Sequence, residues 1–453
     1  MTVADEEGKH DIRARPTKEF FVKMLTKDIR LGPAIIDLID NSIDGARRLR
    51  GEGGYDGLRI DVTVTPGRFA IEDNCGGIEV ELAKKVAFRF GRDEETKGVP
   101  GSIGVVGVGM KRALFKIAKE FKIESVAPRS SFTLHLNVEQ WKNLEDWDFD
   151  FDESTTDTKN PIAKTGTTIT VDSLLEDTKE DFSRESFLDE LFEEVREKEE
   201  IAIENGIQIR VNGDLVEKAP KRLLRSTVIV PAFIKRIIGE NGGAVRVKIY
   251  AGITRSERGD DPQEAGWYVY CNSRQIVGGD QTEATGWGQK EWGEDIPLYH
   301  NQFSWFRGYA FFESDLGERL PWNTTKTELD QSSPVLREVR EDMAALMRPV
   351  IDFLNDIDKE KPFLRRDKTP NRDTPLTAAV YSAKNVELRR LRLNQEFLRP
   401  TPARKVPERP HYNIGYFRPQ AQIDELAKVF KVRSNKAVGE KTFDYTYKRE
   451  RRD

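Results

Sequence analysis

The sequence has few of the residues from which disulfide frameworks and metal centres are built. Only two cysteines, Cys75 and Cys271, occur among 453 residues, which excludes a disulfide framework and fits a reducing cytoplasm. The four histidines are scattered and show no metal-ligand spacing. No apolar run is long enough to span a bilayer, and residues 1–18 are charged, without a signal-peptide core. We therefore expect a cytoplasmic protein that has no membrane partner.

Charge is abundant, but it is unevenly distributed along the chain. Charged residues make up 33% and hydrophobic residues 37% of the sequence, and its length predicts two or three domains. Residues 361–453 contain 23 basic and 11 acidic residues, a net charge of +12. Subtraction from the totals of 73 and 78 leaves 50 basic and 67 acidic residues in 1–360, a net charge of −17. The basic segment either docks on its own acidic body or meets a polyanion such as DNA, and the sequence leaves both open.

Residues 34–46 (AIIDLIDNSIDGA) predict a helix with two distinct faces. The isoleucines recur at steps of three and four and form one apolar face. Asp37, Asn41 and Asp44 repeat at steps of four and three on another face, so a carboxylate and a carboxamide point at the same volume. The Asn41 amide oxygen can bind a divalent cation there, while Asp37 polarises a water. Taken alone, the stretch also fits an ordinary amphipathic helix with a solvated acidic face.

A glycine-rich turn follows a predicted hairpin of two strands, residues 59–64 and 69–72. The turn reads Asp-Asn-Cys-Gly-Gly-Ile over residues 73–78. A carboxylate directly after a strand can accept a hydrogen bond from an exocyclic amine, so Asp73 is a candidate for adenine recognition. The two glycines that follow remove side chains that would block a flat base. In this sequence Cys75 is more typical of a small space-filling residue than of a redox centre.

A second glycine-rich segment, Gly-Val-Val-Gly-Val-Gly-Met-Lys over residues 104–111, opens a predicted helix. Its glycines let backbone amides approach phosphate oxygens, and the helix N-terminus adds positive potential. Lys111 can reach an anionic oxygen, and Thr167, from the later Gly-Thr-Thr, offers a hydroxyl near the base. The segment is not a P-loop, because no Gly-x4-Gly-Lys-[Ser/Thr] occurs. Each motif alone is a weak signal, and their joint order and spacing is the strong one.

In this order and spacing the motifs resemble the GHKL superfamily of ATPases (gyrase, heat-shock chaperone, histidine kinase, MutL). The resemblance implies an α+β protein whose residues 1–175 form a Bergerat-type α/β sandwich that binds ATP. It implies Asn41 as the Mg²⁺ ligand, Asp73 as the residue that reads adenine, and the glycines of 104–109 as the phosphate lid. The full set of implied nucleotide contacts is Asn41, Asp44, Asp73, Gly77, Ile78, Gly104, Val105, Gly107, Val108, Gly109, Met110, Lys111 and Thr167.

The resemblance extends into the following region. Residues 267–276 (WYVYCNSRQI) are similar to a strand and turn with the sequence Phe-Val-Asn-Gly-Arg in the ribosomal S5-like transducer domains of gyrase B, MutL and MORC proteins. Residues 323–328 (NTTKTE) are similar to the loop in which those proteins carry a lysine that reaches the ATP site. This implies a catalytic role for Lys326 at the γ-phosphate. The expected domains are therefore ATP-binding (1–175), transducer (176–332), a helix (333–360) and a basic extension with short C-terminal helices (361–453).

Two positions depart from the family pattern. Asp37, the expected catalytic base, stands where the hydrolytic branches carry glutamate, and Cys75 stands where they usually carry the first glycine of Asp-x-Gly-x-Gly. Aspartate is one methylene shorter, and a misplacement of about 1 Å can cost about a hundredfold in rate. Hydrolysis is therefore expected to be slow.

The resulting hypothesis is a Mg²⁺-dependent conformational switch that closes as a homodimer on ATP and acts on a macromolecule. That macromolecule is expected to be DNA, contacted through the basic 361–453 segment, in repair, chromatin-like or defence functions. A chaperone-like protein-binding scaffold with little hydrolysis is the alternative. A degenerate scaffold without nucleotide is a third, less favoured one, because Asn41, Asp73 and the three lid glycines are all present.

Overall fold

The computed structural model describes residues 16–51, 54–91, 101–104, 107–240, 243–255, 261–366, 375–391, 394–401 and 414–450. Its contacts divide the chain into two units, Met1–Ala403 and Arg404–Asp453, which are described separately. Among the described residues, no helix combines the length and the apolar character that crossing a bilayer requires.

The first unit begins with a mixed sheet, built by the described residues from eight strands in the order β5-β4-β3-β6-β2-β1-β7-β8. Most neighbours are antiparallel, while β1 and β7 run parallel. Buried and exposed residues alternate along β1, as the period of a half-buried strand requires. The strands are β1 (Arg59–Thr65), β2 (Arg68–Asp73), β3 (Ala118–Val126), β4 (Ser131–Asn137), β5 (Glu153–Thr155), β6 (Gly166–Leu174), β7 (Gln208–Val211) and β8 (Asp214–Leu215).

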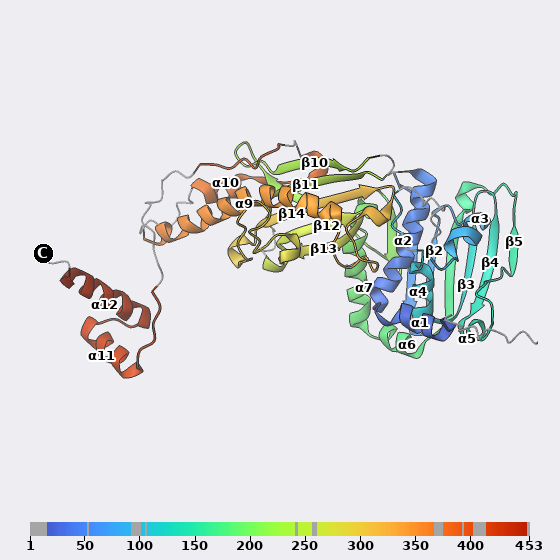
Figure 1. The fold of residues 1–453 in the computed structure, drawn as a ribbon, viewed down its shortest axis with the longest axis horizontal. Helices are drawn as coiled ribbons and strands as arrows, with labels where there is room; N and C mark the ends of the chain where they lie inside the picture. The colour runs from blue at the N-terminus through green and yellow to red at the C-terminus, as the bar shows by residue number, and fades with distance from the viewer. Residues whose placement is uncertain are drawn as a thin grey trace, which may run out of the picture. The chain divides into compact units, whose positions relative to one another are not determined.

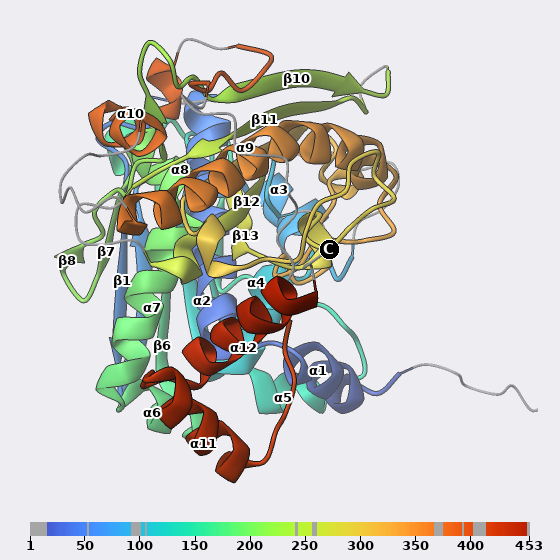
Figure 2. The ribbon, with the colours of Figure 1, turned by 90° about the vertical axis from the view of Figure 1, so that its left-hand side faces the viewer.

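Helices cover one face of this sheet (Figures 1 and 2). The longest of them, α2, buries its isoleucines completely in the core between sheet and helices, as its apolar period predicts. The other helical segments are α1 (Lys18–Lys27), α3 (Val80–Leu82), the π-helical turn η1 (Ala83–Ala87), α4 (Gly109–Ile117), α5 (Val138–Lys142), α6 (Glu176–Phe182), α7 (Glu185–Lys198) and α8 (Glu200–Glu204), with α2 at Leu31–Arg50.

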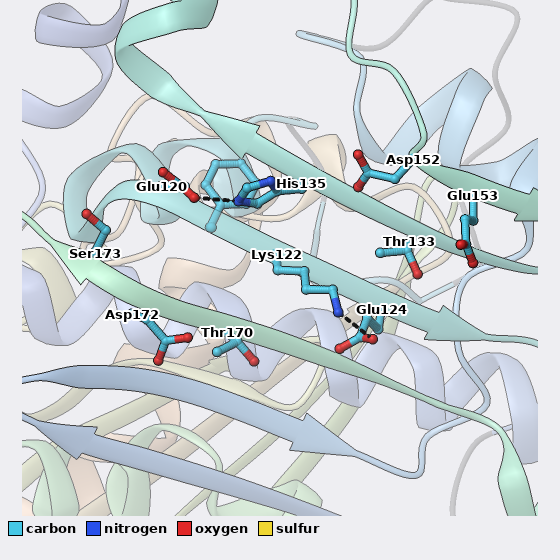
Figure 3. A pocket seen from close by; sticks show the side chains of 11 residues that line it. Glu120, Lys122, Glu124, Thr133, His135, Asp152, Glu153, Thr170, Asp172 and Ser173 are labelled. Atoms are coloured by element: carbon cyan, nitrogen blue, oxygen red, sulfur yellow. Dashed lines mark hydrogen bonds and ion pairs between the residues drawn. The ribbon is translucent and has the colours of Figure 1, made fainter.

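The opposite face of the sheet is polar and forms a shallow hollow (Figure 3). His135 of β4 lies 2.6 Å from Glu120 of β3, and Lys122 donates to Glu124, also on β3, at 2.8 Å. These pairs are largely exposed, so they add little to stability. This face therefore does not contribute to the core.

A second sheet follows in the first unit, with five strands in the order β10-β11-β14-β12-β13 among the described residues. Helix α9 (Pro334–Arg366) packs along one of its faces, where the Trp267 indole donates to the Met347 sulfur at 3.4 Å. The strands are β10 (Ala232–Ile238), β11 (Val245–Ile253), β12 (Gly266–Cys271), β13 (Arg274–Asp280) and β14 (Phe306–Ser314). Short 3₁₀ turns lie at η2 (Ile162–Lys164), η3 (Pro262–Glu264), η4 (Glu283–Thr285), η5 (Asn301–Phe303), η6 (Gly317–Arg319) and η7 (Leu388–Arg390).

Two segments lie elsewhere than the sequence analysis places them. Residues 176–216, expected to begin the second domain, complete the first sheet, because β7 pairs with β1 and its apolar side chains join the first core. Part of the expected basic extension belongs to the first unit: α10 (Pro375–Ser382) leads into β15 (Lys384–Glu387), which pairs with β9 (Arg222–Arg225). Both pairings are long-range, and neither leaves a local signal in the sequence.

The second unit contains two helices in its described part, α11 (Gln420–Phe430) and α12 (Asn435–Glu450), drawn in red in Figure 1. They correspond to the short C-terminal helices expected from the apolar pattern of the last forty residues.

Candidate functional site

The polar face of α2 lies against the glycine-rich segment. A Cβ added at Gly104 would lie 3.2 Å from Asp44 Oδ2 and 3.7 Å from Asn41 Oδ1. A Cβ added at Gly109, the first residue of α4, would lie 3.3 Å from Asp37 Oδ2. The bare backbone of the glycines therefore lets this segment approach the acids and the amide. The predicted contact Val105 lies outside the described residues.

Asp44 holds the described start of that segment in place. Its Oδ2 accepts hydrogen bonds from the Ser102 hydroxyl at 2.5 Å and from the Gly104 amide at 2.9 Å, and its Oδ1 accepts one from the Ile103 amide at 2.8 Å. The carboxylate is buried. In this structure Asp44 orders the loop, and a direct contact between Asp44 and nucleotide stays a prediction.

Asp73 lies at the end of β2, where the sheet turns toward α2. Its Oδ2 accepts from the Ser42 hydroxyl at 2.7 Å, and its Oδ1 accepts from the amides of Cys75 at 2.8 Å and Thr167 at 3.3 Å. Burial raises the pKa of Asp73 above its ordinary value, and these three donors only partly oppose that rise. A carboxylate offers about four acceptor positions, so one more donor, such as an exocyclic amine, can still be accommodated.

Close backbone contacts hold the turn after Asp73 in position. Gly77 has a φ of +67°, and a Cβ there would lie only 2.2 Å from the Val126 carbonyl oxygen. The Ile78 amide donates to the Ser125 hydroxyl at 2.8 Å, and that hydroxyl lies 3.3 Å from the Thr167 hydroxyl. Only glycine fits at residue 77, and the turn thereby brings residue 78 beside Thr167.

A small cavity of about 20 Å³ lies beside Asp73. It has room for about one water molecule, so an adenine enters only if lining side chains move. Met110 and Arg48, both long and unbranched, line the cavity and are the side chains best able to do so. Six predicted contacts line it: Asn41, Asp73, Gly77, Ile78, Met110 and Thr167.

Lys326, predicted from the loop after β14, reaches the acids of α2. Its Nζ donates to Asp40 Oδ2 at 2.8 Å and to Asp37 Oδ1 at 3.2 Å, and the residue has a left-handed φ of 56°. Burial alone would lower the pKa of Lys326, but the two carboxylates outweigh it and the pKa lies above its ordinary value. The lysine is therefore a cation shared by two carboxylates.

Arg112 occupies the second oxygen of Asp37. Its Nη2 donates to Asp37 Oδ2 at 2.6 Å, with both side chains buried. Burial would raise the pKa of Asp37, but Lys326 and Arg112 together hold it below its ordinary value. Asp37 is consequently ionised, with a cation on each oxygen.

A third buried cation, Arg274, continues this network from the first residue of β13. Its Nη1 donates to Glu199 Oε1 at 2.6 Å and to Asp40 Oδ1 at 3.2 Å. The other oxygen of Glu199, Oε2, has no hydrogen-bond partner among the described residues. Burial and the nearby Asp40 raise the pKa of Glu199 to about 8.

Asn272, in the turn between β12 and β13, connects the second sheet to the lid segment. Its Nδ2 donates to the Ser102 carbonyl at 3.1 Å and to the Ser314 carbonyl at 3.0 Å. Arg47, on α2, donates to the Asn272 carbonyl at 3.3 Å. The segment that Asp44 holds from one side is therefore held from the other side by the second sheet.

Comparison with known families identifies the first part of this arrangement. Residues 29–167 match the family described as histidine kinase-, DNA gyrase B- and HSP90-like ATPases. This region is a GHKL-type ATPase domain. No curated protein matches the chain. The matched residues contain α2, Asp73 and both glycine-rich turns, and they end before the second sheet, to which the family assignment does not extend.

The GHKL domain has a side-chain oxygen that could bind the magnesium ion of a nucleotide. The Asn41 amide nitrogen donates to the Asp37 carbonyl at 2.7 Å, which orients its oxygen away from that bond. The described residues contain no group of three or more His, Cys, Asp or Glu suited to a metal. A Mg²⁺ ion here would take Asn41, water and phosphate oxygens as ligands, the usual set for a magnesium nucleotide, and would polarise the phosphate.

Lys111 is already engaged in the GHKL domain. Its Nζ donates to the Ala87 carbonyl at 2.7 Å and lies 5.5 Å above the Phe90 ring. The side chain is 2% exposed. A phosphate contact by Lys111 would require breaking this bond, and it stays a prediction.

Four charged residues of the network are not among the predicted site residues. Arg112 had a signal, because it lies three residues after Gly109 and so on the same side of α4. Asp40 likewise lies three residues after Asp37 on α2. Arg274 lies within the segment that resembles a transducer turn, whereas nothing local points to Glu199.

Replacing Arg274 tests whether the buried network holds the two sheets together. Arg274→Ala leaves Asp40 and Glu199 buried with fewer cations, and we expect a loss of about 3–5 kcal/mol in the free energy of unfolding, seen as a lower melting temperature. Arg68→Ala, which removes an exposed and weakly paired arginine, should change it by about 0.5 kcal/mol or less. Equal melting temperatures of the two variants would contradict this role of Arg274.

Glu199 should make stability fall as pH rises. Its pKa is raised from an ordinary 4.5 to about 8, so the folded chain keeps a proton that the unfolded chain releases between these values. The melting temperature of the wild type should therefore fall further between pH 6 and pH 9 than that of Glu199→Gln, which mimics the protonated acid. Thermal denaturation at both pH values measures this. Parallel pH profiles of the two proteins would refute it.

Proposed function

We propose that the chain is an ATP-driven conformational switch in which Lys326 couples the nucleotide to the second sheet. The observation that carries the proposal is the pair of bonds from Lys326 to Asp40 and Asp37, at 2.8 and 3.2 Å. They join the loop after the second sheet to the helix that carries Asn41. In this proposal the second sheet acts as the transducer domain that its sequence resembles.

The switch follows from competition for one cation. A γ-phosphate bound near Asn41 is a stronger anion than either carboxylate, so Lys326 moves toward it and leaves the pair of acids. Asp40 keeps Arg274 as its counter-ion, which limits the cost of losing the lysine. A ligand shifts a conformational equilibrium only through its different affinity for the two states, and the lysine contact supplies that difference.

The same geometry supports slow hydrolysis. Both oxygens of Asp37 are occupied, one by Arg112 and one by Lys326, and the pKa of Asp37 lies below its ordinary value. A carboxylate in that state is a poor acceptor for a proton from water. Departure of Lys326 frees one oxygen and makes Asp37 a better base. Arg112 remains on the other oxygen of Asp37, which keeps hydrolysis slow.

Closure as a homodimer on a macromolecular target completes the proposal. It is supported by the resemblance to MutL and MORC proteins and by the contacts of Asn272 and Lys326 with the GHKL domain, through which a change in the nucleotide site reaches the second sheet. The structure contains one chain, so the dimer is an expectation.

Substitutions at the nucleotide site separate binding from turnover. Asn41→Ala should weaken Mg·ATP binding by tenfold or more, because the amide ligand is lost. Asp37→Asn should retain binding within about threefold while turnover falls about a hundredfold or more. Lys122→Ala, on the open face of the sheet, serves as the control and should match wild type. Calorimetry and phosphate release measure the two effects, and wild-type values for both site variants would refute the assignment.

Sizing chromatography tests the closure. With a saturating concentration of a non-hydrolysable ATP analogue and Mg²⁺, the wild-type chain should elute as a dimer, whereas Lys326→Ala should remain at its nucleotide-free position although the high analogue concentration fills its weakened site. An unchanged elution of the wild type, or dimerisation of the variant, would remove Lys326 from the coupling role.

A further inference from the structure

The connection between α11 and α12 in the second unit has the form of a helix-turn-helix. Helix α11 ends at Lys431, whose φ of 53° and ψ of 44° are left-handed, and the Val432 amide donates back to the Ala427 carbonyl at 3.0 Å. Ser434 begins α12, because its hydroxyl accepts from the Ala437 amide at 3.2 Å. Four residues, 431–434, therefore separate the helices, and a helix-turn-helix requires three or four.

A buried contact fixes how α12 lies on α11. Val438 is 2% exposed and is the buried residue among the described residues of the two helices, which contact one another. Leu426 and Phe430 of α11 are half-buried, whereas Val429 is 67% exposed. The second helix is thus presented at a defined orientation, which a recognition helix requires.

The turn and the first half of α12 are basic. Lys431, Arg433, Lys436 and Lys441 are all exposed. Lys436 lies 3.8 Å from Glu440, with both side chains largely in solvent, while Arg433 and Lys441 have no acidic partner among the described residues. Residues 404–453 contain 13 basic and 7 acidic residues, a net charge of +6.

We propose that the second unit binds double-stranded DNA with α12 in the major groove. The first turn of a recognition helix meets base edges, which places Asn435 and Lys436 there. Arg433 and Lys441 flank this turn and contact phosphates, and α11 crosses the backbone. This binding goes beyond the nucleotide switch and requires no nucleotide.

A second copy of the chain is the competing occupant of this surface. Phe443 and Tyr447 form a stacked pair on the C-terminal half of α12, with ring centroids 6.1 Å apart, and both are about half exposed. Two copies of the unit would each bring a charge of +6, so their pairing works against repulsion. DNA phosphates neutralise the same charges, and the observations therefore favour DNA.

Fluorescence anisotropy of the full-length protein tests the proposal. The probe is a labelled 24-base-pair duplex of mixed sequence, titrated without nucleotide from about 50 to 200 mM NaCl. The variant R433Q/K436Q/K441Q should bind at least tenfold more weakly, and the slope of log affinity against log salt should fall by about 2 to 3. The matched control K428Q/K448Q/R449Q removes the same amount of positive charge elsewhere in the unit, and its affinity for the duplex should fall by less than threefold. Because all substituted positions are exposed, the circular dichroism spectra of the variants should match that of the wild type. Lys436→Glu alone should also weaken duplex binding.

Other outcomes overturn the proposal. Equal losses in the two triple variants would mean that charge alone matters, and equal affinity for single-stranded DNA would exclude major-groove binding. Unchanged duplex binding by R433Q/K436Q/K441Q would exclude α12 altogether. If F443A/Y447A converts a dimer into a monomer and no duplex is bound, the surface joins two copies of the chain. Asn41→Ala should bind the duplex like wild type, so a failure of the nucleotide switch remains distinguishable.

Discussion

The Lys326 ammonium, shared between Asp37 and Asp40, is the interaction on which the rest of the first unit depends. Buried charges are costly unless they are paired, and here three bases are paired with three acids, of which Glu199 has a pKa raised to about 8 and keeps its proton near neutral pH. The acids are Asp37, Asp40 and Glu199, and the bases are Arg112, Arg274 and Lys326. They come from α2, α4, α7 and its C-terminal end, β13 and the loop after β14. A new anion in this network changes contacts on all of these elements at once.

A second, uncharged connection runs beside the ionic one. Asp44 holds Ser102 from α2, and Asn272 holds the Ser102 carbonyl from the turn between β12 and β13. The GHKL domain is therefore joined to the second sheet both at the predicted base and at the start of the lid. Asn272 lies in the turn between β12 and β13, and Arg274, which shares Asp40 with Lys326, begins β13. Under the proposed switch, both connections therefore reach the β12–β13 hairpin.

Local pattern was sufficient to predict the elements that carry the nucleotide site. The period of α2 separated its isoleucines from Asp37, Asn41 and Asp44, and the structure places the glycine segment against that polar face. Ion pairs and strand pairs between distant segments were much harder to predict. Glu199 acquires meaning only when its distant partner Arg274 is known, because a buried charge looks like any other charge in a sequence. The parallel pairing of β7 with β1 was missed for the same reason. The small size of the cavity beside Asp73 also depends on side-chain packing, which sequence period does not encode.

The central claim is that the γ-phosphate takes Lys326 from the two acids of α2. The most direct measurement compares the dissociation constants of ADP and of a non-hydrolysable ATP analogue for the wild type and for Lys326→Ala. The account predicts that the substitution weakens analogue binding at least tenfold and leaves ADP binding within about twofold. Equal changes for the two nucleotides, or no change for either, would contradict it.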